Sequence, residues 1–302
     1  MTIRPFHNGE LEVQKLAGEE KIASKLNKLI QDSMPSRALE FIRRQSIIWV
    51  GIGDEDGFQW AFPLSGSPGF INPDNEKQIE INLLDDFSIP DEWQNCLKMG
   101  RFIGCLVIDL STRSRIRING TITEVSKNRL AFDVQQAYPN CQKYIRQRKI
   151  QGNNDFCAFH LKSSGTELSE HTKSIINRCD TAFVSSRGPN GEDVSHRGGD
   201  TGFIKCHCNN KVILPDYKGN SMFNTLGNFK INPLGGVTVV DYKQGYFLQM
   251  SGKIKLSFGK EDARIHTGGT KRFWELEISK WYLFQLKSNS KWVDMGFSPY
   301  NP

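Results

Sequence analysis

The chain has 302 residues, of which 38% are hydrophobic, 24% are charged and 11% are aromatic, and its formal net charge is +6. This hydrophobic content can build one large core or two ordinary ones. No stretch approaches the roughly 18 apolar residues of a membrane span, and the first eight residues lack the apolar core of a signal peptide. We therefore expect a soluble, cytoplasmic protein without membrane contact. The mild charge, with no aromatics interleaved for base stacking, also argues against nucleic acid as a partner.

The first elements predicted are helices. Residues 11–34 place apolar side chains on a helical period that is broken near Gly18, which predicts an amphipathic helix or a helix pair. Residues 36–44 favour a further short helix. We interpret residues 1–45 as a helical cover packed on the rest of the protein.

From residue 46 the periodicity changes to that of short strands joined by tight turns, such as the one at Asp56 and Gly57. The strand candidates are residues 46–52, 58–64, 78–83, 104–110, 115–125 and 130–135. This pattern favours a barrel or a sandwich over residues 46–155. Residues 140–150 are predicted to form a basic helix that closes this half.

A second set of strands occupies residues 165–302. It opens with a helix predicted over residues 167–178, with Ser169 as its cap. The strand candidates are residues 180–186, 211–215, 236–241, 246–256 and 274–286.

The two halves align as a repeat with a nearly constant offset. The paired positions are Asp56 and Gly57 with Asn190 and Gly191, Gly69 to Ile71 with Gly202 to Ile204, Asp109 with Asp241, and Gly120 with Gly252. An offset that stays within two residues over both matches predicts a duplication.

Cysteine usage indicates neither disulfides nor a metal site. Seven cysteines, an odd number in a chain of this length, fit reduced thiols. In a strand, Cys206 and Cys208 would share one face while His207 points to the other, and the sequence has no second pair at metal-ligand spacing. We predict no metal site.

The stretch from Ser185 to Gly236 carries the strongest functional signal. It is rich in glycine and polar residues, and it holds Arg197 before Gly198 and Gly199. A guanidinium fork, a Lys amine, amide and hydroxyl donors, and backbone N–H groups freed by glycine together suit a phosphate-bearing ligand.

Three segments, DVSHRGGDTGF, LPDYKGNSMFNTLGNFKINP and VVDYKQGYFLQMSGK, resemble motifs of the pyridoxamine 5'-phosphate oxidase-like family of FMN-binding split barrels. PFHNGELEVQ, TRSRIRINGT and NCQKYIRQR resemble a longer branch, in which this unit is sometimes joined to flavin reductase and ferredoxin modules. The resemblance covers nearly the whole chain and is more specific in the second half. It implies a mainly β (α+β) fold with two tandem split β-barrel halves, packed as an intrachain pseudo-dimer with peripheral helices.

The resemblance also implies an FMN site at the interface between the halves. The expected phosphate ligand is Arg197, shaped by Ser195 and His196, although an Arg that only holds a loop is the alternative. A second arm is expected from Asn224, Thr225, Asn228 and Lys230, with a helix-capping turn as the alternative. Gln249 and Ser251 would reach the flavin ring edge. Arg115, Arg117 and Asn119 share one face of a strand with Arg113, and would either contact the cofactor or form an exposed basic face.

These features predict an FMN-binding flavoprotein, an oxidoreductase with a small-molecule or nicotinamide redox partner. The alternative is a carrier or sensor that holds flavin or haem without turnover. No catalytic side chain is singled out, because the flavin ring itself carries the chemistry. A separate reductase or ferredoxin and a second copy of the chain are the candidate protein partners. The first half has no charged group where Arg197 stands, so we expect one flavin per chain.

Overall fold

The computed structural model describes residues 5–83, 90–152, 156–288 and 291–302, and it begins with helices. These are α1 (Asn8–Ala17), α2 (Glu20–Leu26), the 3-10 helix η1 (Asn27–Leu29) and α3 (Ser36–Arg43). His7 and Glu10 form a capping box at the start of α1, and Gly18 ends the helix with a left-handed φ of 68°. The predicted helix pair with a break near Gly18 is confirmed.

A seven-stranded antiparallel sheet follows, in the order β2-β1-β5-β6-β7-β4-β3. Its strands are β1 (Ile47–Gly53), β2 (Gln59–Ser65), β3 (Ile71–Asn75), β4 (Gln78–Asn82), β5 (Phe102–Asp109), β6 (Ser114–Val125) and β7 (Arg129–Pro139), with the short helix α4 (Asp91–Gln94) before β5. Every predicted strand of this half is present, and β7 runs four residues further than predicted.

The second large sheet has the order β11-β10-β14-β15-β16-β13-β12. Its strands are β10 (Thr181–Gly188), β11 (Gly191–Gly198), β12 (Lys205–Cys206), β13 (Lys211–Pro215), β14 (Leu234–Asp241), β15 (Tyr246–Ser257) and β16 (Phe273–Ser288), with α5 (Glu170–Arg178) before β10 and α6 (Asn224–Ile231) before β14. Ser169 caps α5 as predicted. Each strand has its counterpart in the first sheet at the same place in the order, so the fold consists of two halves of one topology.

Three further strands lie outside these two strand orders. β9 (Phe156–Gly165) pairs with β16 of the second sheet, while β8 (Gln147–Gln151) and β17 (Lys291–Gly296) form a separate two-stranded ribbon. The helix predicted over residues 140–150 is wrong. Tyr144 has a left-handed φ of 64°, which interrupts a helix, and residues from 147 onward pair with β17. Their basic side chains and near-helical spacing gave no sign of a partner strand almost 150 residues away.

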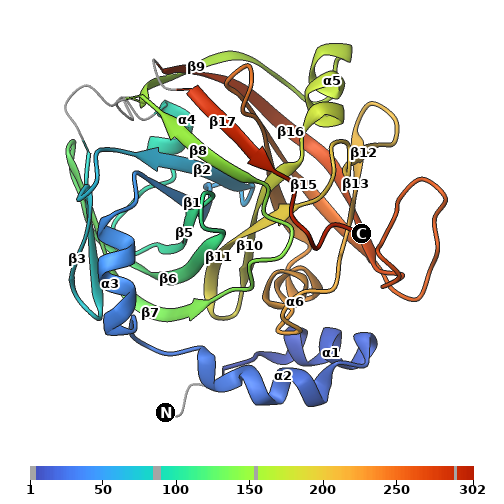
Figure 1. Ribbon diagram of the computed structural model, residues 1–302, viewed down its shortest axis with the longest axis horizontal. Coiled ribbons are helices and arrows are strands. Elements are labelled where there is room, and N and C mark those ends of the chain that lie inside the picture. The colour runs from blue at the N-terminus through green and yellow to red at the C-terminus, as the bar shows by residue number, and fades with distance from the viewer. Residues whose placement is uncertain (1–4, 84–89, 153–155, 289–290) are drawn as a thin grey trace.

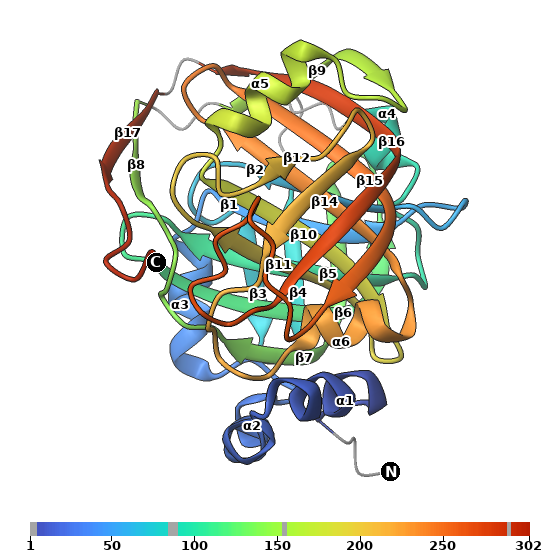
Figure 2. The same cartoon turned by 90° about the vertical axis from the view of Figure 1, so that its right-hand side faces the viewer.

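The two halves meet through their first hairpins, β1–β2 and β10–β11 (Figures 1 and 2). Trp49 of β1 stacks on Phe183 of β10, its counterpart in the repeat, with ring centroids 3.4 Å apart. Gly104 and Gly236, also counterparts, let the opposite hairpin approach, since a Cβ there would lie 2.6 Å from the Asp193 Cα and 2.1 Å from the Gln59 carbonyl oxygen. The interface therefore keeps an approximate two-fold symmetry within one chain.

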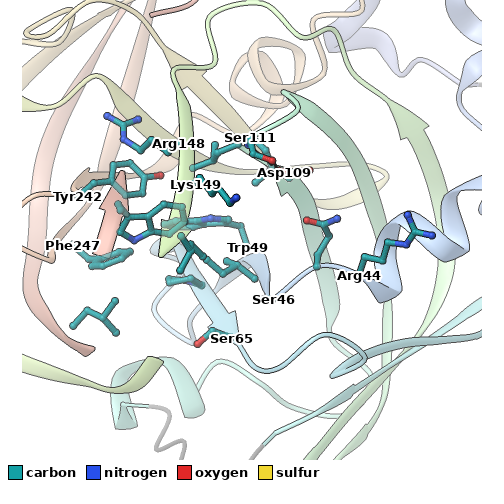
Figure 3. A pocket seen from close by; sticks show the side chains of 18 of the residues that line it. Arg44, Ser46, Trp49, Ser65, Asp109, Ser111, Arg148, Lys149, Tyr242 and Phe247 are labelled. Atoms are coloured by element: carbon teal, nitrogen blue, oxygen red, sulfur yellow. Dashed lines mark hydrogen bonds between the residues drawn. The ribbon is translucent and has the colours of Figure 1, made fainter. Parts of the chain in front are cut away.

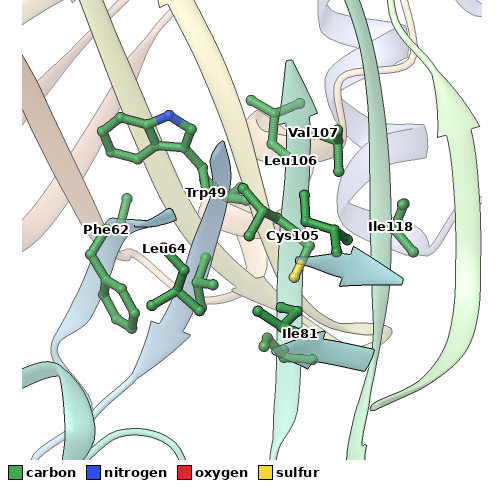
Figure 4. Packing of buried hydrophobic residues seen from close by; sticks show 14 of the residues in the cluster. Trp49, Phe62, Leu64, Ile81, Cys105, Leu106, Val107 and Ile118 are labelled. Carbon is green, nitrogen blue, oxygen red and sulfur yellow. The ribbon is translucent and has the colours of Figure 1, made fainter. Parts of the chain in front are cut away.

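Hydrophobic packing follows this division. One large cluster fills the first half and crosses the interface, and Figure 4 shows part of it around Trp49, Leu64 and Cys105. A second cluster lies within the second half and includes Trp274 and Trp281. Helices α1 and α2 lie outside both large sheets, below α6 in Figure 1. Among the described residues, no helix is long and apolar enough to cross a membrane.

Candidate functional site

Six of the residues predicted for the site line one cavity where the two halves meet. They are Arg115, Arg117, His196, Arg197, Asn224 and Thr225. The remaining walls come largely from residues 140–144, after β7, and from residues 215–223, before α6. The cavity has a volume of about 80 Å³. Strand β6 of the first half and strand β11 of the second thus contribute to one site.

Arg115 is a largely buried cation with no carboxylate partner. Its Nε donates to the Cys141 carbonyl oxygen at 2.9 Å, and its Nη1 donates to the His196 carbonyl oxygen at 3.3 Å. The described residues offer it no ion pair within 4 Å. Burial lowers the pKa of the Arg115 guanidinium to about 10, so the side chain remains charged at neutral pH. A buried charge without an opposite charge is expensive.

Arg197 adds a second guanidinium, which is paired with a carboxylate. Its Nη1 lies 2.8 Å from Asp216 Oδ1, while Asp216 Oδ2 accepts from Arg272 Nε at 3.0 Å. Arg272 is also paired with Glu19 at 2.8 Å, so two carboxylates serve the two guanidinium groups. The Arg197 Nε is buried and finds no acceptor among the described residues. Arg197 therefore adds an unused donor to the uncompensated charge of Arg115.

His196 and Asn140 add buried polar atoms that also lack partners in the described part of the chain. They are both ring nitrogens of His196 and both amide atoms of Asn140. Burial, together with the charges of Arg115, Arg148 and Arg197, holds the pKa of His196 well below its ordinary value. The imidazole is therefore neutral at pH 7, with one nitrogen able to donate and the other able to accept.

The backbone beside these groups is strained. Tyr144, Ser221 and Phe223 all line the cavity with left-handed φ angles of 64°, 62° and 60°. The Tyr144 hydroxyl donates to the Lys218 carbonyl oxygen at 3.0 Å and ties the two walls together. Strained residues of this kind cluster at functional sites and are held by their surroundings.

Of the two glycines after Arg197, Gly199 does not present a free N–H group to this cavity. Its N–H donates to the Asp180 carbonyl oxygen at 3.2 Å, while Gly198 lies opposite Thr181 at the end of β11 and lines the cavity. The predicted role in freeing backbone donors is therefore wrong for Gly199.

Helix α1 occupies much of the predicted second arm. Glu12 lies 2.9 Å from the Lys230 ammonium, and Asn228 Oδ1 lies 2.8 Å from His7 Nε2. The Asn224 amide donates to Glu10 Oε1 at 2.5 Å. Lys230 and Asn228 do not line the cavity, so the structure separates them from Arg197.

Two glycines make this contact possible. A Cβ at Gly9 would lie 2.2 Å from the Gly227 carbonyl oxygen, and one at Gly227 would lie 2.4 Å from the Glu10 side chain. The two helices therefore cross backbone to backbone. Gly227 of the NTLGNF motif therefore allows α6 to pack closely on α1.

Burial makes Glu10 a pH-sensitive part of this contact. Burial, opposed by hydrogen bonds from the His7 N–H and the Asn224 amide, raises the pKa of Glu10 from 4.5 to about 8. The fold therefore favours the protonated carboxyl. Its contribution to stability is complete below about pH 4.5 and is lost as the pH rises through about 8.

We expect Glu10→Gln to remove this dependence. Between pH 5 and 8, the free energy of unfolding of the unmodified protein should fall relative to that of the variant, as measured by denaturant titration. Glu12→Gln is the matched control, because Glu12 lies on the same helix with its side chain half exposed. Parallel pH curves for the unmodified protein and Glu10→Gln would contradict the assignment.

Arg117 and Asn119 point into the interface between the halves. Arg117 Nη1 lies 2.8 Å from Asp193 Oδ2, and Asp193 Oδ1 accepts from Asn119 at 3.4 Å and from the Tyr138 hydroxyl at 3.1 Å. The alternative of an exposed basic face is excluded for Arg115, Arg117 and Asn119. Arg113, which was predicted to share their face, lies in the turn before β6 with a left-handed φ of 59°.

Gln249 and Ser251 are buried in the same interface. Gln249 accepts from Trp93 Nε1 at 2.9 Å and donates to the Ala61 carbonyl oxygen at 2.8 Å, while Ser251 Oγ accepts from the Gln59 N–H at 2.9 Å. Both bind strand β2 of the first half. Neither lines the cavity. Ser195 is also buried, and its hydroxyl bonds that of Thr225.

The repeat gives the first half an equivalent position, where apolar side chains replace charged and polar ones. Leu64 stands at the position of Arg197, and Phe62 stands at that of Ser195. Trp93 of α4 stacks on Phe62 with ring centroids 4.8 Å apart. Trp93 is the counterpart of Thr225, so an aromatic stack replaces the hydrogen bond between Thr225 and Ser195.

Several site residues were not predicted. They are Asn140, Tyr144, Asp216, Tyr217 and the glycine-containing turn at 219–221. The turn before α6 was visible as a Gly-Asn signal within the KGNSMF segment. The sequence did not indicate Asn140 and Tyr144 as site residues, because the pattern of residues 140–150 predicted a helix.

Comparison with known proteins gives resemblance of fold over part of the chain. No family model matches the sequence, and no curated protein matches it. HupZ of Group A Streptococcus matches with a TM-score of 0.31 and 13% identity, over 38% of this chain and 98% of that chain. A pyridoxamine 5'-phosphate oxidase-related, FMN-binding protein from Nostoc punctiforme matches with a TM-score of 0.27 and 8% identity, over 45% of this chain and 100% of that chain. MrkH of K. pneumonia, solved with c-di-GMP, matches with a TM-score of 0.25 and 12% identity, over 86% of this chain and 88% of that chain. The ligands of those proteins say nothing of this chain.

Proposed function

We propose that the cavity between the halves binds the phosphate of FMN and that the protein is a flavoprotein. The observation that supports this is Arg115, a buried guanidinium whose hydrogen bonds go to two carbonyl oxygens and a thiol. A phosphate would supply the missing negative charge. Arg197 Nε and the Asn140 amide, both without acceptors among the described residues, would donate to its oxygens.

The cavity is large enough only for the phosphate end of FMN. A volume of about 80 Å³ is well below the roughly 300 Å³ at which pockets for whole small molecules begin. When bound, FMN supplies electron or hydride transfer at its ring. The part of this chain is to hold and orient the phosphate. Redox turnover with a nicotinamide or another small donor belongs to the same proposal.

Titration calorimetry with FMN and with riboflavin tests whether the cavity binds the phosphate. Riboflavin lacks the anion, and two charge-assisted hydrogen bonds of about 1.5 kcal/mol or more each predict FMN binding roughly 100-fold tighter or better. One FMN per chain is expected, because the equivalent place has Leu64 and Phe247 where the cavity has Arg197 and Arg115. Equal affinities, or two flavins per chain, would overturn the proposal.

Absorption spectra of the FMN complex then test turnover. Bleaching of the flavin band by a nicotinamide donor is the expected result for an oxidoreductase. A bound flavin that no donor reduces would instead identify a carrier or sensor.

A further inference from the structure

A second cavity of about 210 Å³ also lies where the two halves meet, bordered by the β8–β17 ribbon (Figure 3). It shares no residue with the phosphate cavity. Its walls come from both halves: Trp49 and Ser65 belong to the first hairpin, while Tyr242 and Phe247 belong to the second half. Nothing in the proposed FMN site uses it.

Aromatic rings form much of the wall. The Trp49 and Phe247 ring centroids lie 6.1 Å apart, and Tyr242 meets Trp292 edge to face at 5.0 Å. Figure 3 shows Trp49, Tyr242 and Phe247 gathered on one side of the cavity. Such faces and edges favour a planar ring between them. An apolar cavity of about 150 Å³ holds one benzene molecule, so this cavity suits one or two fused rings.

The charged groups around this cavity have ion-pair partners, hydrogen-bond donors or access to water. Arg148 lies 2.5 Å from Asp180 and stacks over the Tyr242 ring at 4.2 Å. The Asp109 carboxylate accepts from the hydroxyls of Ser111 and Thr112 at 2.7 and 2.8 Å. Lys149 is exposed, so water solvates its ammonium. Unlike the site of Arg115, this cavity therefore offers no buried charge in need of a counterion, which favours an uncharged ligand.

One polar atom in the wall lacks a partner. Ser65 Oγ is buried, its residue is only 3% exposed, and it makes no hydrogen bond within the described part of the protein. A buried hydroxyl without a partner costs free energy. We propose that this cavity binds an uncharged planar aromatic molecule of one or two fused rings that carries a hydroxyl, which hydrogen-bonds Ser65.

The probe is 2-naphthol, with naphthalene as the analogue that lacks the hydroxyl. Titration calorimetry of the full chain should give saturable 2-naphthol binding at one site, with a Kd on the order of 100 µM. Saturating FMN should leave this Kd unchanged, since the two cavities are separate. Ser65→Ala should weaken 2-naphthol about threefold to tenfold and leave naphthalene unchanged.

A cavity-filling variant completes the test. Ile150 lies in the ribbon and lines the cavity, so Ile150→Trp should abolish 2-naphthol binding. Val293→Trp is the matched control, because it adds the same ring to the same ribbon at an exposed position outside the cavity. Absence of 2-naphthol binding, unchanged binding by Ile150→Trp, or equal losses of naphthalene and 2-naphthol in Ser65→Ala would each overturn the proposal. Should Ile150→Trp fail to fold, the Ser65→Ala comparison decides.

Discussion

Replacing Asp193 with alanine is expected to lower the free energy of unfolding by about 3 to 5 kcal/mol. The Asp193 side chain is 4% exposed and faces the 11% exposed Arg117 at 2.8 Å across the interface. Removing the carboxylate leaves that guanidinium buried without an opposite charge. It also removes the acceptor for Asn119 and for the Tyr138 hydroxyl. Denaturant unfolding followed by circular dichroism measures the loss.

Asp133→Ala is the control for this prediction. Asp133 lies on β7 of the same half as Arg117, but it is exposed and accepts a surface hydrogen bond from Gln78 at 3.3 Å. Its replacement should change stability by no more than about 0.5 kcal/mol. A loss of less than about 1 kcal/mol for Asp193→Ala would show that Arg117 finds another partner or reaches water.

The alternation of apolar residues and the internal repeat were enough to predict most of the fold from the sequence. Strand β1 was readable from SIIWVGI alone, and Asp109 with Asp241 marked equivalent turns after β5 and β14, where each carboxylate accepts from the backbone two residues on. The ribbon of β8 and β17 was not readable. Its pairing depends on contacts between distant residues, which local periodicity does not encode.

The candidate site, too, could be predicted only in part from the sequence. Arg115 and Arg197 were predicted from local patterns, and the structure places both at one cavity because β6 and β11 meet at the interface. Lys230 was assigned to the same site because the resemblance implies a phosphate-binding lysine in the turn that also holds Asn224. In the structure it faces Glu12, a residue more than 200 positions away. Proximity along the chain could not show which face of α6 the first helix would cover.

Replacing Arg115 with methionine is expected to weaken FMN binding at least thirtyfold, or about 2 kcal/mol. The guanidinium is the one buried cation of the site without a carboxylate among the described residues, so it has the most to gain from a phosphate. The stability of the ligand-free protein should change little, by about 1 kcal/mol or less. Two carbonyl oxygens lose a donor, but an uncompensated buried charge disappears with it. Calorimetric titration and thermal unfolding measure the two quantities.

Arg113→Met separates a specific effect from a general loss of positive charge beside strand β6. Arg113 lies in the turn before β6, two residues from Arg115, and it also bonds carbonyl oxygens, those of Ile145 and Phe297 at 2.9 and 2.8 Å. It does not line the cavity. FMN affinity should therefore be unchanged in this variant. Equal weakening in both variants would indicate that the site depends on the general positive field of the strand. Undiminished affinity in Arg115→Met would mean that the buried Arg115 charge is tolerated without a ligand. If the guanidinium bound the phosphate, its removal would weaken FMN binding.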